Sequence, residues 1–476
     1  MSAPFTSPPS ATPPTAELPR LNRTLRQVPK APVRIVHLGL GAFHRSHQAW
    51  YTQQASDSAG WGIAAFTGRR PDAALALAEQ DGLYTLVERA DEGDSFTVMG
   101  SIVEALDGAD IERLAALVAA PETALVTLTI TEAAYGLGAD GKLDTKAPDV
   151  AADLALLGSG SGRPTTPLGR LVLALAARRE AGSGPIAIVC CDNLSNNGTV
   201  ARQAVAGFAG AWDSEFAAWV TGNVSFVSTS VDRITPRTTE GDLAAVREAC
   251  GYVDNSPVVA EPFSSWVLSG DFPAGRPRWE DAGALFVQDI EPYENRKLWL
   301  LNGAHSLLAY AGQLRGHATV AEALADPWCR RAVEAFWDEA ETNLAGPADL
   351  RIPEYRQALL ARFSNARIAH NLAQIAMDGS TKLRMRAVPV LQAERAAGRS
   401  GAAAALMIAV WMDYSATASP FQDPLEQAVT AANRLPGTER TKALLAVVDP
   451  ALAGDAGVVG LVESLCGTAA GRSASE

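Results

Sequence analysis

The sequence has few cysteines and no long apolar run, and both shortages restrict what kind of protein it encodes. Its 476 residues include five cysteines, which form no CxxC pair and no regularly spaced ladder. We therefore expect no disulfide framework and a reducing location, the cytoplasm. The longest apolar run, 402–412, is much shorter than the roughly 20 residues of a membrane span, and no apolar signal core begins the chain. No membrane association is expected.

Basic residues are also fewer than acidic residues. The chain carries 40 basic and 53 acidic residues, which gives a net charge of −13 at pH 7. Such a chain repels phosphate-rich polymers and anionic membranes, so we expect no nucleic-acid partner. The partner expected instead is a small molecule, and an anionic one would need a local group of basic residues.

The length and the apolar pattern predict two folded domains after an arm. Residues 1–31 are rich in Pro, Ser, Thr and Ala and are expected to form an N-terminal arm that is flexible over most of its length and becomes ordered near 21–25. Residues 32–285 alternate short apolar runs with helix-like stretches, which predicts an α/β domain with a doubly wound parallel sheet. Residues 286–476 have helical spacing and predict a mostly α-helical C-terminal domain. The expected strands are 34–38, 62–66, 124–130, 185–191 and 224–231.

A glycine turn follows the first expected strand, RIVHL. Gly39, Gly41, Ala42 and Phe43 lie where a strand passes into a helix start. Backbone N–H groups at such a turn can hold the pyrophosphate of a dinucleotide, as in a Rossmann-type domain. His44 stands in place of the third glycine of GxGxxG, so a tight turn without a ligand is the alternative. Its place on the first strand favours a Rossmann-type NAD(P)-binding domain.

The end of the second expected strand leaves the choice of coenzyme open. NAD-binding domains often have an acid there to hold the ribose, but this strand ends in Phe66-Thr67-Gly68-Arg69-Arg70. Arg69 is the candidate contact, because an arginine can bind the 2′-phosphate of NADP. It could equally be a solvated loop charge. NAD is expected, with NADP possible.

Polar residues also follow the later strands, at the edge where ligands of a doubly wound sheet bind. Glu132, Asn193 and Asp232 each stand directly after or at the end of one such run. Each could instead form a turn or cap a helix. Asn193 is the most informative of the three, because a carboxamide can donate a hydrogen bond to a developing alkoxide.

The run KLWLLNGAH places an amine, a carboxamide and an imidazole on one expected helix. With α-helical spacing, His305, Asn302 and Glu294 lie within roughly 140° of Lys297 around the axis. Lys297 with a lowered pKa would act as a general base, and Asn302 and His305 would bind an oxygen whose charge changes. This chemistry suits the interconversion of alcohols and ketones, although a packing helix with solvated polar residues has the same spacing.

A basic cluster at 378–386 includes Lys382 and could bind a carboxylate or hydroxyl groups of a substrate. Alternatively, it is a solvated helix start. The histidines show no metal-ligand spacing with cysteines or carboxylates, so we expect no metal and a metal-independent reaction.

Several motifs together resemble the mannitol dehydrogenase and fructuronate reductase family of long-chain polyol dehydrogenases, over about residues 21–465. They are GLGAFHRSHQA at 39–49, TITEAAYG at 129–136, CDNLSNNG at 191–198, VSFVSTSVDRITP at 224–236, EPFSSWVLSGDFPAGRP at 261–277, and the Lys-x4-Asn-x2-His pattern that begins at Lys297. The resemblance implies a Rossmann-type domain, a helical domain, a site between them and direct hydride transfer between substrate and a nicotinamide.

The resemblance also implies residue roles. It makes Lys297 the general base, makes Asn193 and Asn302 the pair that stabilises the alkoxide, and makes His305 a hydrogen-bond partner of the substrate. Glu294 would lie near the proton exit.

Further roles are expected outside these five residues. Asp232 and Lys382 would contact the substrate, and we expect Glu132 to serve with Glu294 in the proton relay. The family is often monomeric, so a monomer or weak homo-oligomer is expected.

The sequence departs from the family where substrate choice is set. Ala133 stands where relatives often have lysine, Ser195-Asn196 replaces a frequent Pro-His or Pro-Gly, and 383–385 replaces Leu-Pro-Gln. Gln374 stands where the mannitol enzymes have arginine, which favours a fructuronate reductase with Gln374 in the substrate site. Mannitol 2-dehydrogenase and, less favoured, mannitol-1-phosphate 5-dehydrogenase are the alternatives. A non-catalytic dinucleotide sensor is the alternative of another class.

Overall fold

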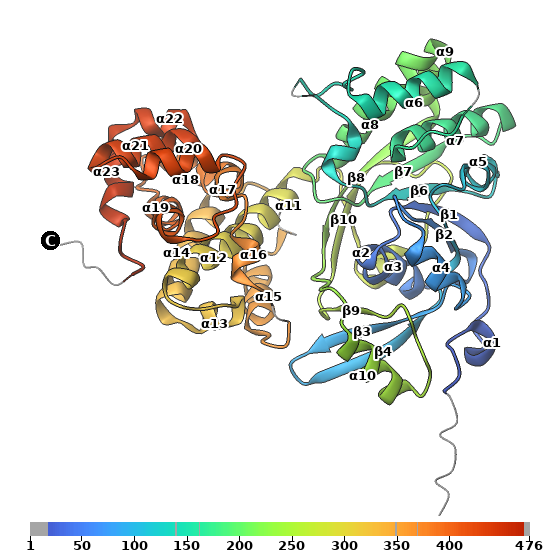
Figure 1. Cartoon of the computed structure of the whole chain (residues 1–476), viewed down its shortest axis with the longest axis horizontal. Helices are drawn as coiled ribbons and strands as arrows, with labels where there is room; N and C mark the ends of the chain where they lie inside the picture. The colour runs from blue at the N-terminus through green and yellow to red at the C-terminus, as the bar shows by residue number, and fades with distance from the viewer. Residues whose placement is uncertain (1–17, 139, 161, 348–349, 369, 471–476) are drawn as a thin grey trace, which may run out of the picture.

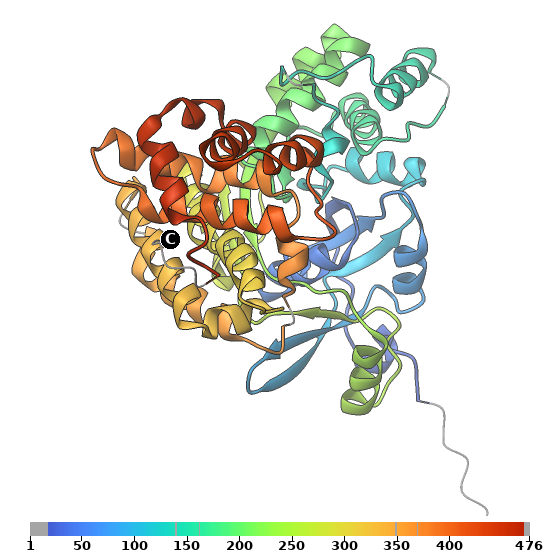
Figure 2. The ribbon, with the colours of Figure 1, turned by 60° about the vertical axis from the view of Figure 1, so that its left-hand side comes forward.

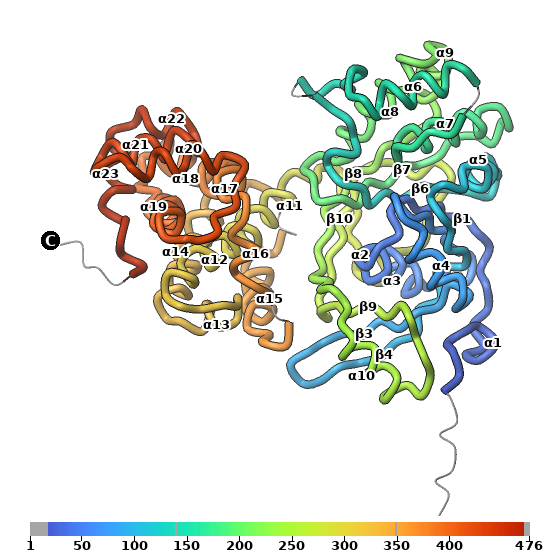
Figure 3. The backbone as a smooth tube through the Cα atoms, viewed as in Figure 1, coloured from blue at the N-terminus to red at the C-terminus, as the bar shows by residue number. Residues whose placement is uncertain are grey.

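The computed structural model describes residues 18–470, apart from 139, 161, 348–349 and 369. Two parts lie side by side: an N-terminal part built around sheets and a C-terminal part of helices (Figures 1 and 2). The Cα trace in Figure 3 shows that the chain passes from one part to the other near α11 (Glu291–Arg296). Of the expected N-terminal arm, residues 1–17 lie outside this description.

An eight-stranded sheet forms the centre of the first part. Six strands are parallel in the order β5-β2-β1-β6-β7-β8, which is the doubly wound Rossmann order with a reversal between β1 and β6. Next to β8, β10 runs antiparallel and pairs with β11. The bounds are β1 Val33–Leu38, β2 Gly62–Phe66, β5 Ile102–Leu106, β6 Leu125–Leu128, β7 Ile186–Cys190, β8 Val224–Asp232, β10 Ser265–Ser269 and β11 Leu285–Phe286.

The central strands are apolar at successive positions because both faces of the sheet are covered. Every residue of β2 (GIAAF) and β7 (IAIVC) is buried. One face packs on α5 (Ile111–Ala119), α6 (Pro148–Ser159), α7 (Pro167–Ala181), α8 (Asn197–Trp212) and α9 (Ser214–Asn223). The other face packs on α3 (Gln48–Gln54), α4 (Asp72–Ala78) and the short helix Trp279–Ala282. The Rossmann-type domain expected from the sequence is therefore confirmed.

A second, three-stranded sheet lies below the first in Figure 1 and was not predicted by the strand pattern. Its order is β4-β3-β9, with β3 at Tyr84–Ala90, β4 at Gly93–Met99 and β9 at Val258–Ala260. Helix α10 (Glu240–Cys250) packs beside it. The strand β9 is contributed from a distant part of the chain, so local sequence could not indicate the pairing.

Residues 18–31, expected as part of a flexible arm, are packed against the sheet domain. Leu21 is fully buried, and its N–H donates to the carbonyl of Val253. The short helix α1 (Arg23–Arg26) follows. The Arg23 guanidinium donates to backbone carbonyls of Asp81, Pro29, Gly100 and Ile102. The order expected near 21–25 therefore extends over 18–31, because Leu21, Val28 and Arg23 fix the segment without any periodic pattern.

The second part is mostly helical, as expected. Helices α12 and α19 lie in its core and are buried along most of their length. The apolar run 402–412 belongs to α19 and is a core helix. None of the described helices is long and apolar enough to cross a membrane. The bounds are α12 Ala304–Leu314, α13 Val320–Ala325, α14 Pro327–Asn343, α15 Ile352–Ser364, α16 Leu372–Ile375, α17 Gly379–Arg386, α18 Val388–Ala396, α19 Ala402–Thr417, α20 Glu426–Asn433, α21 Gly437–Val448, α22 Pro450–Gly454 and α23 Ala456–Leu465.

Candidate active site

Lys297 lies where the two parts meet. Its Nζ donates a hydrogen bond to Oδ1 of Asn193 at 2.6 Å and another to the carbonyl of Val231 at 2.7 Å. Asn193 follows β7 and Val231 lies in β8, so a side chain of the helical part reaches the carboxyl ends of two neighbouring strands. This is the edge at which doubly wound sheets bind ligands. The structure thus brings together two residues that the sequence predicted for one site.

The segment Lys297–Gly303 is π-helical and not α-helical as expected, and we call it the π-turn. A π-helix forms its hydrogen bonds from residue i to i+5. Lys297 and Asn302 are five positions apart, so they lie one hydrogen-bonded turn from each other. On an α-helix they would be separated by roughly 140° around the axis. The π-turn therefore brings the amine and the carboxamide toward the same side of the helix.

The pKa of Lys297 is lowered, first because the amine is buried. Asp232 acts in the opposite direction, whereas the positive charges of Arg362 and Arg386 lower the pKa further. A lysine with a lowered pKa holds a larger fraction of neutral amine near physiological pH. This is the state that a general base needs.

His305, on α12, presents a neutral imidazole near the same place. Its ring contacts those of Phe363 and His370, with centroid distances of 4.6 and 4.7 Å. Burial lowers the pKa of His305 well below 6.5, and it lowers the pKa of His370 to about 4. Nε2 of His305 is buried without a hydrogen-bond partner among the described residues. It is therefore a group that a substrate oxygen could satisfy.

The two residues expected in the proton relay occupy different environments. Glu294 is buried, and its Oε1 accepts a hydrogen bond from the N–H of Asn196 at 2.9 Å. Burial raises the pKa of Glu294, while the charge of Lys297 acts to lower it. Glu132 is exposed at the start of the short helix Glu132–Tyr135 and makes no hydrogen bond or ion pair within the described part of the chain. Of these two carboxyl groups, only that of Glu294 has an electrostatic interaction with Lys297.

Asp232 is bound by an arginine that sequence reasoning missed. Arg362, on α15, donates to both carboxylate oxygens of Asp232 at 2.7 and 3.0 Å. It also donates to both oxygens of Glu261, at 2.9 and 2.7 Å. Burial acts to raise the pKa of Asp232, but the ion pair with Arg362 lowers it. Asp232 was expected to contact the substrate. Its ion pair with Arg362 joins the two parts of the molecule, and its negative charge acts to raise the pKa of Lys297. No local sequence signal marked Arg362, because its acidic partners come from another domain.

The basic cluster lies on α17. Nζ of Lys382 donates to the carbonyl of Ile375 at 3.0 Å, and burial followed by repulsion from Arg386 lowers its pKa. Arg386 is buried at its guanidinium, which lowers its pKa to about 10. Neither cation forms an ion pair with a carboxylate among the described residues. Gln374, on α16, is exposed, and its side chain makes no hydrogen bond in the described structure.

The glycine turn has two glycines with different roles. Gly39 has φ +113°, and a Cβ there would lie 2.2 Å from the carbonyl oxygen of Thr129, so only glycine fits. Gly41 has φ −141°, and a Cβ there would meet nothing closer than 3.6 Å. Packing within the protein therefore does not require a glycine at position 41, although close approach of a ligand to the backbone would.

The residues after Gly41 form the short helix α2 (Ala42–Ser46), with Gly41 as its N-cap. His44, in place of the third glycine, is buried and stacks on His37 of β1 with a centroid distance of 3.4 Å. Phe43 stacks on His47. A pair of imidazoles thus fills the contact between helix and strand for which other glycine turns use a glycine. The departure from GxGxxG is accommodated by packing, and Ala42 and Phe43 at the start of α2 are partly exposed.

Arg69 lies exposed in the loop after β2, at the position expected to meet the ribose of a cofactor. The adjacent Arg70 pairs with Asp72 at 3.7 Å. The side chain of Arg69 has no hydrogen-bond or ion-pair partner within the described residues, so it is available to a ligand.

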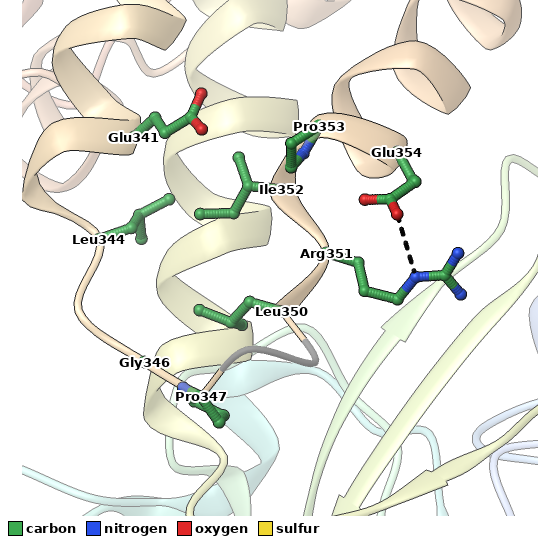
Figure 4. A pocket seen from close by; sticks show the side chains of 9 residues that line it. All are labelled: Glu341, Leu344, Gly346, Pro347, Leu350, Arg351, Ile352, Pro353 and Glu354. Carbon is green, nitrogen blue, oxygen red and sulfur yellow. Dashed lines mark ion pairs between the residues drawn. The ribbon is translucent and has the colours of Figure 1, made fainter.

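Two further observations concern metal binding and a hollow outside the site. No cluster of three or more potential metal ligands occurs among the described residues. A hollow of about 300 Å³ lies between the end of α14 and the start of α15, lined by residues within 341–354 (Figure 4). It contains none of the residues predicted for the site and is separate from Lys297.

Comparison with known families places this geometry in context. The model of the mannitol dehydrogenase Rossmann domain matches residues 33–281, and that of the mannitol dehydrogenase C-terminal domain matches residues 289–463. The chain therefore belongs to the mannitol dehydrogenase family. It is an oxidoreductase, a dehydrogenase acting on CH–OH groups, as predicted from the sequence.

Individual relatives carry two different activity names at nearly equal identity. D-mannonate oxidoreductase of Escherichia coli K12 is 38% identical over 430 residues, 87% of each chain. Mannitol 2-dehydrogenase of Cereibacter sphaeroides is 37% identical over 393 residues, 80% of each chain. Pseudomonas fluorescens mannitol 2-dehydrogenase, solved as a ternary complex with NAD and D-mannitol, superimposes with a TM-score of 0.78 at 34% identity and covers 95% of this chain and 96% of its own. Overall identity therefore does not distinguish the two substrates.

Proposed function

We propose that the protein transfers hydride between NAD and the secondary alcohol of a sugar acid, as a fructuronate reductase that interconverts fructuronate and mannonate. The single observation that carries the reaction type is the Lys297 amine, which has a lowered pKa and lies 2.6 Å from Oδ1 of Asn193 at the carboxyl edge of the sheet. A base and a carboxamide so placed can remove a hydroxyl proton and stabilise the alkoxide that results.

The residues present fit a dinucleotide. A pyrophosphate usually binds at a glycine turn that leads into a helix, next to a reversal of winding in the sheet. Here these features are Gly41, the start of α2 and the reversal between β1 and β6. Ala42 and Phe43 would lie against it, and Arg69 would lie near the ribose. The related structure solved with NAD supports NAD as the coenzyme, with NADP possible through Arg69. When bound, the nicotinamide accepts or supplies the hydride.

The proton steps belong to residues of this chain. In oxidation, the neutral Lys297 amine takes the hydroxyl proton. Because Oδ1 of Asn193 already accepts from Lys297, the Nδ2 hydrogens of Asn193 are left to donate to the alkoxide, together with the carboxamide of Asn302. Neutral His305 would hold a substrate oxygen through its unpartnered Nε2. The buried carboxyl of Glu294, coupled to Lys297, would pass the proton outward.

The charge of the site favours an anionic substrate. Lys382 and Arg386 repel each other on α17, and neither forms an ion pair with a carboxylate among the described residues. The charges of Asp378 and Asp423 offset part of the effect on Lys382, and a substrate carboxylate would offset more of it. Gln374 lies on the adjoining α16 and would contact the same substrate. The related D-mannonate oxidoreductase supports this assignment.

Mannitol 2-dehydrogenase is the second candidate, supported by the related enzyme of that name and by the similar solved structure. Initial rates with fructuronate and fructose, each with NADH and NADPH, test the proposal. We expect kcat/KM for fructuronate to exceed that for fructose. A preference for fructose would overturn the sugar-acid assignment and favour the second candidate.

A further inference from the structure

The π-turn receives hydrogen bonds from two side chains outside it. Nε1 of Trp337, on α14, donates to the carbonyl of Leu300 at 2.7 Å, in a fully buried contact. The Arg386 guanidinium donates to the carbonyl of Asn302 at 3.1 Å and to Oγ of Ser306 at 2.9 Å. Both acceptors lie near the end of the π-turn, where the hydrogen-bond spacing changes from five residues to four. Carbonyls near such a change can lose a regular helical donor, and a buried carbonyl without a donor is costly.

The packing against α14 is close on the same side. A Cβ on Gly303, the last residue of the π-turn, would lie 2.5 Å from ring atom Cε1 of Phe336. Phe336 and Trp337 of α14 therefore contact the end of the π-turn, and Arg386 of α17 donates hydrogen bonds to it. The segment is fixed by contacts from two directions, and its own residues supply neither donor.

We propose that Trp337 and Arg386 are positioning residues, which stabilise the π-turn and thereby keep Lys297 and Asn302 on one side of the helix. Without these two donors, the regular i to i+4 spacing would be favoured, and the carboxamide of Asn302 would turn away from the Lys297 amine. The inference rests on the proposed function, because it concerns the geometry of the base and of the group that stabilises the alkoxide. Trp337 acts without contact to the substrate. The positioning role of Arg386 is separate from the charge that it contributes to the substrate site.

Replacing Trp337 by Phe tests the proposal, and Trp411 supplies a matched control. Both tryptophans are fully buried in the helical part, but Nε1 of Trp411 has no hydrogen-bond partner among the described residues. W337F and W411F therefore remove similar volumes from the same core, and only W337F removes a donor to the π-turn. We expect W337F to lower kcat about tenfold to a hundredfold, as a displaced reacting group does, with the Kd for NADH unchanged.

If Trp337 had only a structural role, its replacement would not change the pH profile of oxidation, so this profile distinguishes the two roles. Burial keeps the pKa of Lys297 low, so relaxation of the π-turn should raise it and shift the acidic limb of the oxidation profile upward. W411F should leave kcat within about twofold and the limb in place, even at an equal loss of Tm. Equal effects of the two variants on kcat and on the limb would overturn the proposal.

Should W337F fail to fold, R386K decides the question with the same two measurements. Lysine keeps the positive charge beside Lys297, but it cannot donate to Asn302 and Ser306 in the geometry of the guanidinium. A loss of kcat and an upward shift of the limb support the proposal, and unchanged values overturn it. If K297A retained kcat, the proposed function itself would fail. If K297A loses kcat while W337F behaves as W411F, only the positioning role fails.

Discussion

The amine of Lys297 and Oδ1 of Asn193 lie 2.6 Å apart although 104 positions separate the two residues in the chain. One belongs to the helical part and the other follows a strand of the Rossmann-type domain. The base and its carboxamide partner are therefore assembled only when the two parts are docked. The ion pairs of Arg362 with Asp232 and Glu261 cross the same boundary and hold the parts in that relation.

Removal of the amine should abolish chemistry without abolishing cofactor binding. K297A deletes the proposed base and leaves the glycine turn more than 200 positions away in sequence intact. General-base catalysis contributes about 10²- to 10⁴-fold, so we expect kcat to fall by that factor. Titration of NADH by fluorescence should give an unchanged Kd. The exposed Lys442, replaced by Ala, is the control and should retain full activity.

The same variant separates an enzyme from a dinucleotide sensor. A sensor has no proton to remove, so the loss of the amine would not alter its response to the cofactor. Retention of both cofactor binding and turnover in K297A would contradict Lys297 as the base. A loss of cofactor binding in K297A would instead indicate that the residue holds the nicotinamide end of the ligand.

The pH dependence should have opposite signs in the two directions of reaction. Oxidation requires neutral Lys297, so its kcat falls as the pH drops below the lowered pKa of the amine. Reduction requires the protonated amine, so its kcat falls as the pH rises above the same value. Replacing Asn193 by Asp would place a carboxylate beside the amine and raise its pKa, because an opposite charge favours the ammonium form. The acidic limb of oxidation should then shift upward.

N193A provides the comparison for this shift. It removes the alkoxide donor without adding charge, so kcat should fall about 10²- to 10³-fold. The acidic limb of the oxidation profile should not shift upward in N193A, in contrast to N193D. A limb that stays in place in N193D would contradict the assignment of the titration to Lys297. Both profiles can be measured by nicotinamide absorbance.

Arg362 should be a major determinant of stability. R362M leaves the carboxylates of Asp232 and Glu261 buried and unpaired, and breaking a buried pair in this way costs about 3–5 kcal/mol. Urea unfolding at pH 7 would measure the loss. Arg330, whose pair with Glu334 is exposed, is the control, and its replacement by Met should change the midpoint little.

The destabilisation by R362M should depend on pH with a defined sign. In the native protein Arg362 lowers the pKa of Asp232, so its contribution to stability is present above the unfolded pKa of about 3.9 and is lost below the folded value. In R362M, burial alone should raise the folded pKa above the unfolded one. The native protein and R362M should therefore differ most in their free energy of unfolding near neutral pH, and this difference should become smaller toward pH 4. An equal difference at both pH values would contradict the role of the ion pairs.

Much of the fold was predictable because it depends on local apolar pattern. Of the five predicted strands, β2, β6 and β7 are buried at every residue and β1 and β8 at most residues, and the helical part follows from helical spacing. The hairpin of β3 and β4 was missed, because its residues alternate in burial less clearly and its third strand, β9, comes from far along the chain. The π-turn was missed because its sequence, KLWLLNG, has no feature that distinguishes it from an α-helix. The donors near its end come from other helices.

The candidate site shows the same division. Lys297, Asn193, Asn302 and His305 were predicted from residue chemistry and resemblance, and the structure brings Asn193 to the amine. Arg362 could not be found, since an arginine on a polar helix is ordinary until its partners are known. Glu132, expected in the proton relay, is exposed at the turn after β6 and makes no hydrogen bond or ion pair among the described residues.

Lys382 should determine preference for an acidic substrate. It is half-buried and is influenced by the charges of Asp378 and Asp423, but it forms no ion pair among the described residues, so a substrate carboxylate would provide a directly bound counter-charge. K382M should lower kcat/KM for fructuronate about tenfold or more, in line with the loss of one charged hydrogen bond of about 1.5–3 kcal/mol, and should affect fructose much less. K442M, which removes an exposed cation outside the site, is the control and should change kcat/KM for neither sugar. Equal losses for both sugars in K382M would show that Lys382 binds a hydroxyl group common to them, and the argument from charge for a sugar acid would then fail.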